Sequence, residues 1–543
     1  MKNKWISHSI ILGMATALFL SLSFTACNDL DQFPTGKFTE GNYWASADKA
    51  HSVLNMAYSQ MYSAAYFFST EALSDNVHQI RISDEKTIAS GQANAATGRF
   101  ANEWRDCYAG IKTCHTLLEN IDRVPDMDET LKNRMKAEAR FIRAWLFFRL
   151  TTWYGDVPLF TKDITVSESK TIARTPRAEV LQFVRNELEE IASILPTNKQ
   201  YAEEDRGRIT AGTAIALKAR TYLYDNDWGN VVTTCERLIG KTTYGEYDLF
   251  DDFEGLFAVA NEYNCEVILD ITHIPSLRMW SEFYDYAPPS AGQRVCGMSP
   301  AQDLVEDFIM LNGKSIKESG SGYDEENPYV NRDPRMDATI VRHLSSFTTL
   351  GGVTRTIYTK PGSTTDETEL KDVWTGSGET ASRTGYYIRK YYDPTAIANF
   401  ESGLNLILIR YADVLLMYAE AKAELEQLDA TVWNSTIRAI RYRAGFREAG
   451  ALDFPGTTGL KEIVRRERRS ELAFESTRIH DIRRWHTAET VLNRPARGAK
   501  FADNNTNYIS LEQRSFNPER DYLWPVPQGD KDKNPNLGQN PQY

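Results

Sequence analysis

Residues 211–238 read AGTAIALKARTYLYDNDWGNVVTTCERL, and this stretch decides the fold class. Apolar residues recur at helical spacing on both sides of a short polar turn, at Ala211, Ala214, Leu217 and Tyr224 and then at Trp228, Val231, Cys235 and Leu238. Small alanines that face large aromatic rings let two helices approach closely, as in tetratricopeptide-like helix pairs. The stretch therefore predicts a helical hairpin and indicates a mainly α protein.

The same pattern returns elsewhere in the chain. A second pair starts at Tyr411, Leu415, Tyr418 and Ala423, and its partner carries Ile437, Ile440 and Ala444. Further helical stripes begin at Ala50, Tyr108, Phe141 and Val180. Because the 34-residue tetratricopeptide consensus is not met cleanly, we expect degenerate helix pairs within an all-helical body.

The segment 263–402 has a different character from the helical parts on either side. Residues 266–271 (EVILDI) predict a short strand, and Gly, Pro, Ser and Thr accumulate between Gly351 and Gly385. Long ordered loops often carry function. We therefore expect one domain over 27–543, in which a loop-rich insert with short strands (263–402) separates an N-terminal helical part (27–262) from a C-terminal one (403–543).

Composition excludes several classes of protein. The chain has 543 residues, of which 62 are Lys or Arg and 74 are Asp or Glu, so the net charge is −12. Binding to nucleic acid needs clustered basic residues against the phosphates, so we expect no nucleic-acid partner. Apolar runs after the first thirty residues are short and broken by charge, which excludes a multispanning membrane protein.

The first 26 residues have the pattern of a signal peptide. A basic head with Lys2 and Lys4 precedes an apolar stretch over residues 10–24, and the segment holds no acid. The end of this segment, Phe24-Thr25-Ala26-Cys27, resembles a bacterial lipoprotein box, with Phe24 in place of the usual leucine.

Cys27 is therefore the predicted site of lipidation and the new N-terminus. A cysteine with two or more acyl chains would anchor the protein stably at a membrane. The alternative is a plain secreted protein that is cut elsewhere, for example after Ser23, with Cys27 present by coincidence.

Neither metal nor cofactor chemistry is indicated. The other five cysteines are scattered and form no CxxC pair, at Cys107, Cys114, Cys235, Cys265 and Cys296. The chain contains no HExxH, GxSxG or GxGxxG motif. We expect no metal site, no cofactor and no catalytic residue.

One segment of the C-terminal part is dense in charge. Glu467, Glu471 and Glu475 follow each other at helical spacing among seven arginines between 465 and 484. A glycosidase needs two carboxylates about 5–10 Å apart across a cleft, whereas carboxylates neutralised by arginines stay ionised. We interpret the segment as a structural ion-pair network. We therefore expect that the protein is not an enzyme.

Aromatic side chains are the remaining candidates for ligand contacts. Sugar rings have apolar faces that stack on Trp and Tyr. Trp280, Tyr284 and Tyr286 lie in a Pro-bounded, loop-rich stretch, where we expect exposure. Trp145, Trp153, Trp228 and Trp485 fall in helical patterns and are expected in the core.

Eight blocks, in order, give the chain a resemblance to the SusD/RagB-like family of outer-membrane nutrient-uptake lipoproteins. They are Cys27 with its following Leu30, Asp31 and Pro34; WASADKA (44–50); AEARFIRA (137–144); YGDVPL (154–159); RDPR (332–335); RYADVLLMYAEA (410–421); ERRSELAFE with DIRRW (467–475 and 481–485); and LWPVP with the Asn-Pro pairs 534–535 and 540–541.

This resemblance implies a lipid-anchored protein at the outer face of the cell outer membrane. Family members capture oligosaccharides, without catalysis, and cap a SusC-like TonB-dependent transporter. Asp29 and Asp31 are similar to the family's surface-export signal, and Arg332–Arg335 is similar to a structural motif. By position in the family, the ligand residues would be Asn76, His78, Trp280, Tyr284 and Tyr286.

Two other functions remain open at this point. A helical scaffold of this kind commonly holds peptides in its groove, so a peptide-binding lipoprotein is one alternative. A lipid-anchored glycoside hydrolase is the other. Cleavage of a bound polysaccharide would identify the hydrolase. Binding of peptides without binding of sugars would identify the scaffold.

Overall fold

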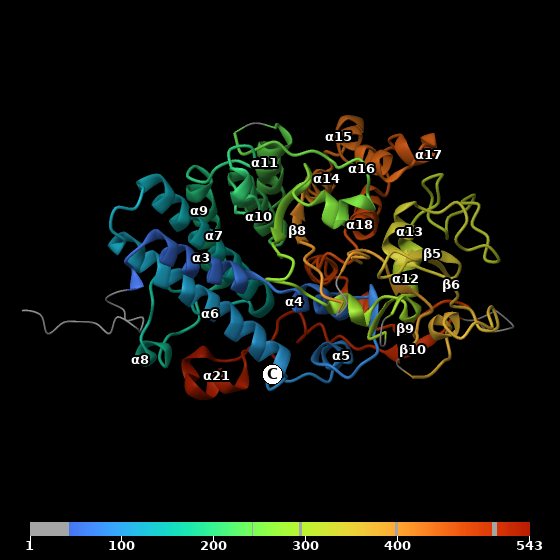
Figure 1. Ribbon diagram of the computed structural model, residues 1–543, viewed down its shortest axis with the longest axis horizontal. Coiled ribbons are helices and arrows are strands. Elements are labelled where there is room, and N and C mark those ends of the chain that lie inside the picture. Colours follow the sequence, from blue (N-terminus) through green and yellow to red (C-terminus); the bar gives the residue numbers. More distant parts are fainter. Residues whose placement is uncertain (1–42, 242, 293–295, 379, 397–399, 502–507) are drawn as a thin grey trace, which may run out of the picture.

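The computed structural model describes residues 43–241, 243–292, 296–378, 380–396, 400–501 and 508–543. The predicted signal peptide and Cys27 lie outside these residues. The chain is mainly helical, with short strand pairs, as the sequence predicts. Figure 1 shows the N-terminal helices at one end of the molecule, the strand-containing middle segment at the other, and the C-terminal helices of residues 411–471 above the middle segment.

The N-terminal part consists of helices packed side by side. They are α3 (Ala47–Met61), α4 (Ala64–Ser69), α5 (Asp84–Ala89), α6 (Gly98–Asn120), α7 (Glu129–Tyr154), α8 (Val166–Ser169), α9 (Arg177–Ala192), α10 (Ala211–Leu223) and α11 (Trp228–Ile239). The longest, α7, starts where the Asp128 side chain accepts a hydrogen bond from the Leu131 N–H and ends at Gly155, whose φ is 75°.

The hairpin predicted over 211–238 is confirmed by α10 and α11. The Thr210 hydroxyl and the Thr213 backbone N–H form a capping box at the start of α10, and Asp227 accepts from the Asn230 N–H at the start of α11. Ala214 and Leu217 from α10 and Val231 from α11 are fully buried between them.

The middle segment contains short elements joined by turns. Its elements are β2 (Val267–Ile271), β3 (Met298–Pro300), α12 (Gln302–Asp307), α13 (Arg335–Thr339), β4 (Ile340–Val341), β5 (Ser345–Thr348), β6 (Thr354–Ile357) and β7 (Tyr387–Ile388). The predicted strand at 266–271 is confirmed as β2. It pairs in antiparallel fashion with β8 (Leu406–Arg410), so the two ends of the middle segment lie side by side.

All strand pairs among the described residues are antiparallel and two-stranded. Besides β2–β8 they are β1 (Val77–Gln79) with β3, β4 with β7, β5 with β6, and β9 (Pro495–Arg497) with β10 (Ser510–Gln513). The β9–β10 hairpin comes from the C-terminal part but lies beside α12, where Arg497 pairs with Asp303 at 2.5 Å.

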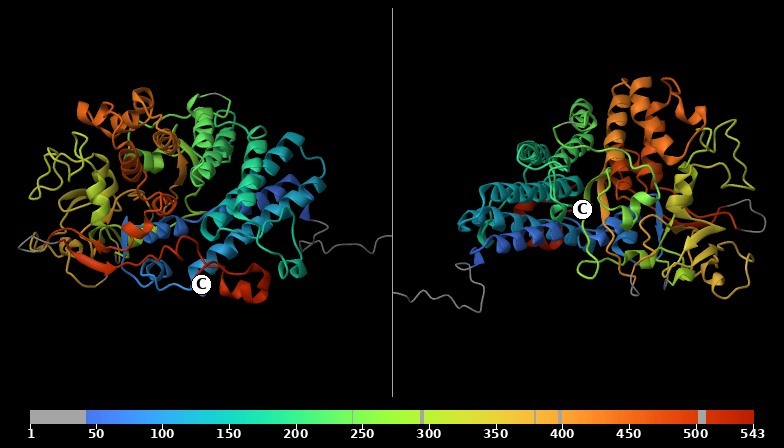
Figure 2. Two further views of the ribbon diagram at one scale, coloured as in Figure 1. Left: turned by 180° about the vertical axis from the view of Figure 1, so that it is seen from behind. Right: turned by 45° about the horizontal axis from the view of Figure 1, so that its top comes forward.

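The C-terminal part begins with helices and ends in a long tail. Its helices are α14 (Tyr411–Glu424), α15 (Ala430–Ser435), α16 (Ile437–Ala444), α17 (Ala449–Leu452), α18 (Leu460–Glu471), α19 (Arg478–Arg484), α20 (Ala488–Val491) and α21 (Gln528–Lys533). The tail returns to the N-terminal helices, and both views of Figure 2 place α21 beside them. There Trp524 stacks on Trp153 with ring centroids 3.9 Å apart.

A buried ion-pair network joins these parts. Arg410, which is fully buried, pairs with Glu266 and Glu471 at 2.6 Å each and with Glu475 at 2.8 Å. Arg335 of the RDPR stretch pairs with Glu471 at 2.7 Å and Glu467 at 2.8 Å. The network interpretation of the charged segment is therefore confirmed, and Asp333 and Arg335 of the RDPR stretch belong to the same network.

The carboxylates of α18 are held ionised. Burial alone would raise the pKa of Glu471, but the guanidinium groups of Arg443, Arg410 and Arg335 outweigh burial and hold the pKa below its usual value. The pKa of Glu467 is lowered in the same way by Arg335 and Arg441. These groups are therefore unsuited to donate a proton near neutral pH.

The remaining core agrees with the predicted helical patterns in most places. Trp145 and Trp153 are buried, whereas Trp228 and Trp485 are only partly buried. No helix within the described ranges has the length and apolar character needed to span a bilayer.

Replacing Glu471 by Gln tests the network. The variant leaves three buried guanidinium groups short of a carboxylate, so we expect the free energy of unfolding to fall by about 3 kcal/mol or more. Because the pKa of Glu471 is depressed in the folded state, this contribution is present above the unfolded pKa of about 4.3 and is lost as the pH falls through the folded value. Urea denaturation at several pH values measures both effects.

Glu462→Gln is the matched control, because Glu462 lies exposed on the same helix. We expect it to change the unfolding free energy by no more than about 0.5 kcal/mol. Equal losses in the two variants would contradict a dominant role for the network.

Candidate functional site

The middle segment and the β9–β10 hairpin enclose a cavity of about 350 Å³. This volume falls in the range of about 300–1,000 Å³ that is typical of small-molecule sites. We call it the tyrosine cavity after Tyr323, Tyr329, Tyr386 and Tyr508. Phe501 lines it as well, and charged side chains share the wall, among them Arg332, Arg342, Lys360 and Lys500.

Local hydrogen bonds fix the loop that carries Tyr323 and Tyr329. The Asp324 carboxylate accepts from the Glu326 N–H at 3.0 Å and from the Asn327 side-chain amide at 2.8 Å, which forms an Asx-type turn. At the end of the loop, Arg332 donates to carbonyl oxygens at the C-terminal end of α12, including that of Phe308 at 2.6 Å. The loop is thereby tied to a helix at one end.

The floor of the cavity is a chain of hydroxyl contacts. The hydroxyl oxygens of Tyr329 and Tyr386 lie 3.1 Å apart, and the Tyr386 hydroxyl donates to the Gln302 side-chain oxygen at 2.7 Å. Tyr386 is buried, whereas Tyr329 is partly exposed. The two rings therefore stand in fixed positions before any ligand arrives.

The opposite wall comes from the C-terminal hairpin. The guanidinium of Arg497 and the ammonium of Lys500 lie 5.1 and 4.6 Å from the ring centroid of Tyr508. Lys500 also pairs with Glu325 at 3.1 Å, and this pair connects the hairpin to the Tyr323 loop. Residues far apart in the sequence thus complete one site.

The cavity offers aromatic faces together with neutral hydroxyl groups. Burial raises the pKa of Tyr323 to about 12, so its phenol stays protonated at neutral pH and can both donate and accept hydrogen bonds. The carboxylates in the wall, Glu325 and Glu326, are exposed. This arrangement suits the binding of a polyhydroxylated molecule with apolar faces.

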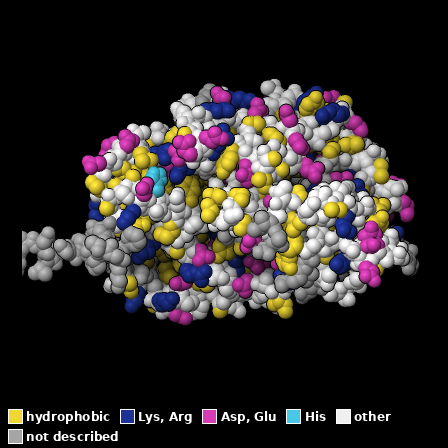
Figure 3. Space-filling model, in the orientation of Figure 1, with side chains coloured by type: hydrophobic (Ala, Val, Ile, Leu, Met, Phe, Trp, Pro, Cys, Tyr) yellow, Lys and Arg dark blue, Asp and Glu magenta, His cyan; other side chains and the backbone are white. Residues whose placement is uncertain are grey.

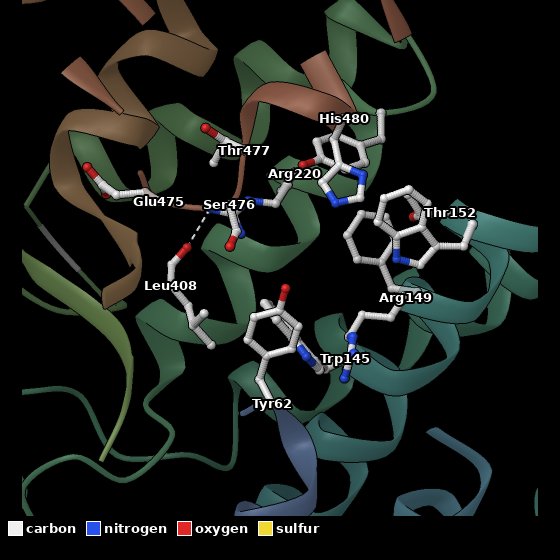
Figure 4. Close-up of a pocket in the computed structure, with 13 residues that line it drawn as sticks. Tyr62, Trp145, Arg149, Thr152, Arg220, Leu408, Glu475, Ser476, Thr477 and His480 are labelled. Atoms are coloured by element: carbon white, nitrogen blue, oxygen red, sulfur yellow. Dashed lines mark hydrogen bonds between the residues drawn. The ribbon is translucent and has the colours of Figure 1, made fainter. Parts of the chain in front are cut away.

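A second, smaller cavity lies inside the helical body (Figure 4). It has a volume of about 60 Å³ and is lined by side chains that include Tyr62, Trp145, Arg149 and His480. The volume is well below that of ordinary ligand sites. Within the described residues, no group of three or more His, Cys, Asp or Glu is placed to hold a metal ion.

The predicted exposure of the stretch 280–286 is wrong for two of its three aromatic residues. Trp280 is only 4% exposed, donates its indole N–H to the Leu404 carbonyl at 2.7 Å, and packs on Phe68. Tyr286 is 1% exposed and also packs on Phe68, with the two ring centroids 5.1 Å apart. Both rings form core, because the loop folds inward over α4.

Tyr284 is the aromatic residue of this stretch that stays partly exposed. It lies on a short turn of 3₁₀-helix, Glu282–Asp285, with its ring centroid 4.5 Å from that of Phe400. It does not line the tyrosine cavity.

Asn76 and His78 are also buried. The Asn76 amide donates to Glu71 at 2.9 Å, and its oxygen accepts from Arg469 at 3.0 Å, so its polar atoms are engaged within the protein. His78 lies on β1, opposite Ser299, with Nδ1 3.4 Å from Glu512. Burial lowers the pKa of His78, although Glu512 opposes this effect. Neither residue lines the tyrosine cavity.

None of the five ligand residues predicted from the sequence lines the tyrosine cavity. Tyr323, Tyr329 and Tyr386 fall in the loop-rich insert, and Tyr508 falls in the C-terminal part. The available signal was the clustering of tyrosines at 323 and 329 next to the RDPR stretch. Nothing in the spacing indicated that Tyr508, in the C-terminal part, would join them.

Charges are mixed on the surface that Figure 3 presents. Acidic, basic and hydrophobic side chains alternate over the described residues of that face and do not gather into one basic patch. This distribution agrees with the acidic composition of the chain.

Two family models match the chain. The model described as the SusD family matches residues 269–543, and the model described as "Starch-binding associating with outer membrane" matches residues 37–223. The first match covers the middle segment from β2 onward and the whole C-terminal part, including the tyrosine cavity.

Individual proteins are similar over nearly the full length. The SusD-like protein P2 of Formosa agariphila is 26% identical, over 97% of this chain and 99% of that protein. The solved structure of a SusD-like carbohydrate binding protein from Bacteroides fragilis has a TM-score of 0.81 at 27% identity, covering 91% of this chain and 100% of that chain. A second SusD-like protein from B. fragilis has the same fold, with a TM-score of 0.79 at 24% identity over 93% of this chain and 99% of that chain.

Replacing Trp280 by Ala tests its assignment to the core. We expect the unfolding free energy to fall by about 3–5 kcal/mol, because the change empties a large buried volume. The partly exposed Tyr284 provides the comparison, and Tyr284→Ala should cost about 1 kcal/mol or less. Thermal and urea denaturation measure both. A small loss for Trp280→Ala would contradict its burial.

Proposed function

Because the chain belongs to the SusD family, we propose that it binds oligosaccharides or polysaccharide ends in the tyrosine cavity and does not cleave them. The observation that carries the proposal is the wall of Tyr323, Tyr329, Tyr386 and Tyr508 around about 350 Å³. The name of the B. fragilis relative, a carbohydrate binding protein, supports the same class of ligand.

The chemistry of the cavity favours sugar over peptide. Tyr323 and Tyr508 are partly exposed and can stack on the apolar face of a pyranose ring. Neutral tyrosine hydroxyls and the nearby Asn327 amide can exchange hydrogen bonds with sugar hydroxyls. Binding without cleavage is supported by the position of Glu325 and Glu326, which are neighbours in one exposed loop of the wall, whereas a glycosidase needs two carboxylates that flank the scissile bond.

We further propose that the protein delivers its ligand to a SusC-like TonB-dependent transporter. In this proposal the mature chain begins at a lipidated Cys27 and is anchored to the outer membrane, facing the cell exterior. The signal-like segment before Cys27 supports the anchor, and the family model described as associating with the outer membrane supports the location.

Truncation of the two cavity tyrosines tests ligand binding. We expect Tyr323→Ala and Tyr508→Ala each to weaken oligosaccharide binding about five- to tenfold, because each removes one stacking face from the site. Isothermal titration against a panel of neutral oligosaccharides measures the dissociation constants. Tyr442→Ala is the matched control, because Tyr442 is an exposed tyrosine on α16 that does not line the cavity.

Three results would count against the proposal. If Tyr442→Ala weakened binding as much as Tyr323→Ala, the effect would not be specific to the tyrosine cavity. Retention of peptides without any sugar binding would favour a peptide-binding scaffold. Release of product from a bound polysaccharide would indicate a hydrolase.

Replacing Cys27 by Ser tests the anchor. We expect the wild-type protein in the membrane fraction and the variant in the soluble fraction, because the variant lacks the thiol that receives the lipid. Fractionation and metabolic labelling with a fatty acid measure the outcome. A labelled variant, or a wild type that carries no label, would contradict lipidation at Cys27.

A further inference from the structure

A third cavity, of about 300 Å³, opens between α7, the start of α9, the α10–α11 turn, α19 and the C-terminal tail. We call it the arginine pocket. Its wall includes Arg177, Asn226, Arg483, Arg484, His486 and Tyr522. It shares no lining residue with the tyrosine cavity.

Two of its three arginines are neutralised within the protein. Arg484 donates to both oxygens of Glu420 at 2.6 Å each and also pairs with Asp481 at 2.8 Å. Arg177 pairs with Asp225 at 2.5 Å, and the same carboxylate accepts from Arg185 at 3.1 Å. Asp225 is therefore already shared by two guanidinium groups.

Arg483 is different, because no carboxylate of the described residues lies within 4.0 Å of it. Its side chain donates to the Tyr522 carbonyl and lies over the Trp153 ring, with the guanidinium carbon 4.7 Å from the ring centroid. Arg483 is 8% exposed, and its buried Nε has no hydrogen-bond partner among the described residues. The neighbouring Asp521 pairs with Arg520 at 2.6 Å instead.

An unneutralised guanidinium in such a place is costly. A buried charge is normally paired, and a buried polar hydrogen without an acceptor costs free energy. Burial lowers the pKa of Arg483 to about 10, and Arg177 lowers it further, although Tyr543, Tyr522 and the more distant Asp521 carboxylate oppose this effect. At neutral pH the group is still a cation, so an anion in the pocket would compensate its charge.

His480 connects the arginine pocket to the inner cavity of Figure 4. Its ring lines both spaces, together with Thr152 and Tyr224. Burial lowers the pKa of His480 well below its usual value, and Arg483, Arg220, Arg149 and Arg484 lower it further. The ring is therefore neutral, mainly because it is buried and additionally because of these four cations.

We propose that the arginine pocket is a binding site for the carboxylate or sulfate group of a small molecule, with Arg483 as the principal contact. Arginine suits both groups because its N–H donors match two oxygen acceptors of a carboxylate or sulfate. The volume of about 300 Å³ admits a ligand of the size of an acidic monosaccharide. The site is independent of neutral sugar binding in the tyrosine cavity.

Titration with two anions tests the proposal. Sodium glucuronate and sodium sulfate are titrated into the protein at constant ionic strength, with glucose as the neutral comparison. We expect at least one anion to bind, and which one binds identifies the recognised group. Arg483→Gln should weaken binding about tenfold or more, because it removes the charge that assists the hydrogen bonds.

Arg483 is buried, so Arg483→Gln could unfold the protein. A variant at the surface of the pocket therefore provides a second test. Asn226→Asp places a negative charge at the exposed rim, where φ of 55° suits Asp as well as Asn. We expect it also to weaken anion binding severalfold. Asn434→Asp adds the same charge at an exposed position on α15 outside the pocket and should leave anion binding unchanged.

Four outcomes would overturn the site. They are failure of both anions to bind, unchanged binding in Asn226→Asp, equal weakening in Asn226→Asp and Asn434→Asp, and loss of anion binding in Tyr323→Ala. The last outcome would assign the anion to the tyrosine cavity. Failure of oligosaccharide binding alone would leave the arginine pocket untouched, so the two proposals fail separately.

Discussion

The contact between Arg410 and three buried carboxylates is the constraint on which the rest of the structure depends. Arg410 ends β8, Glu266 precedes β2, and Glu471 and Glu475 lie at and beyond the end of α18. The network holds five carboxylates and five cations, namely Glu266, Asp333, Glu467, Glu471 and Glu475 with Arg335, Lys390, Arg410, Arg441 and Arg443. The opposite charges are equal in number, and their contacts fix β2–β8, α16, α18 and the middle segment against one another.

The ion-pair network also holds part of the tyrosine cavity in place. Arg335 anchors one end of the segment that carries Tyr323 and Tyr329, since Asp333 and Arg335 are bound to each other and to α18. The opposite wall is held by the pair of Arg497 with Asp303 on α12. Loops thus supply the contact residues while buried charge supplies the rigidity, a common division between scaffold and binding surface.

Local patterns in the sequence predict the helices well but predict the exposure of the aromatic residues poorly. The hairpin of α10 and α11 follows directly from apolar spacing, because its helices bury one face each. Trp280 and Tyr286 resemble exposed loop residues in sequence, yet they pack on Phe68, which is more than two hundred residues earlier. Burial of a loop depends on where the chain returns, and spacing within a segment holds no information about that.

The same reasoning explains the sites. The hairpin of β9 and β10 brings Tyr508 to the tyrosine cavity. Arg483 lies in a motif whose other charged residues, Asp481 and Arg484, form ion pairs. The spacing of the charges indicates a network, but only the tertiary structure distinguishes Arg483, which has no carboxylate partner in the part of the chain that the structure describes. The type of residue at a position therefore does not decide its function, because the function depends on its tertiary contacts.

The returning tail has a consequence for the order of folding. Asn540 donates to the Tyr154 carbonyl and Trp524 stacks on Trp153, so the last residues of the chain complete the end of α7. These contacts join residues separated by most of the chain, and such long loops close late and slowly. The end of α7 therefore reaches its final packing only after residues 524–540 have folded back onto it.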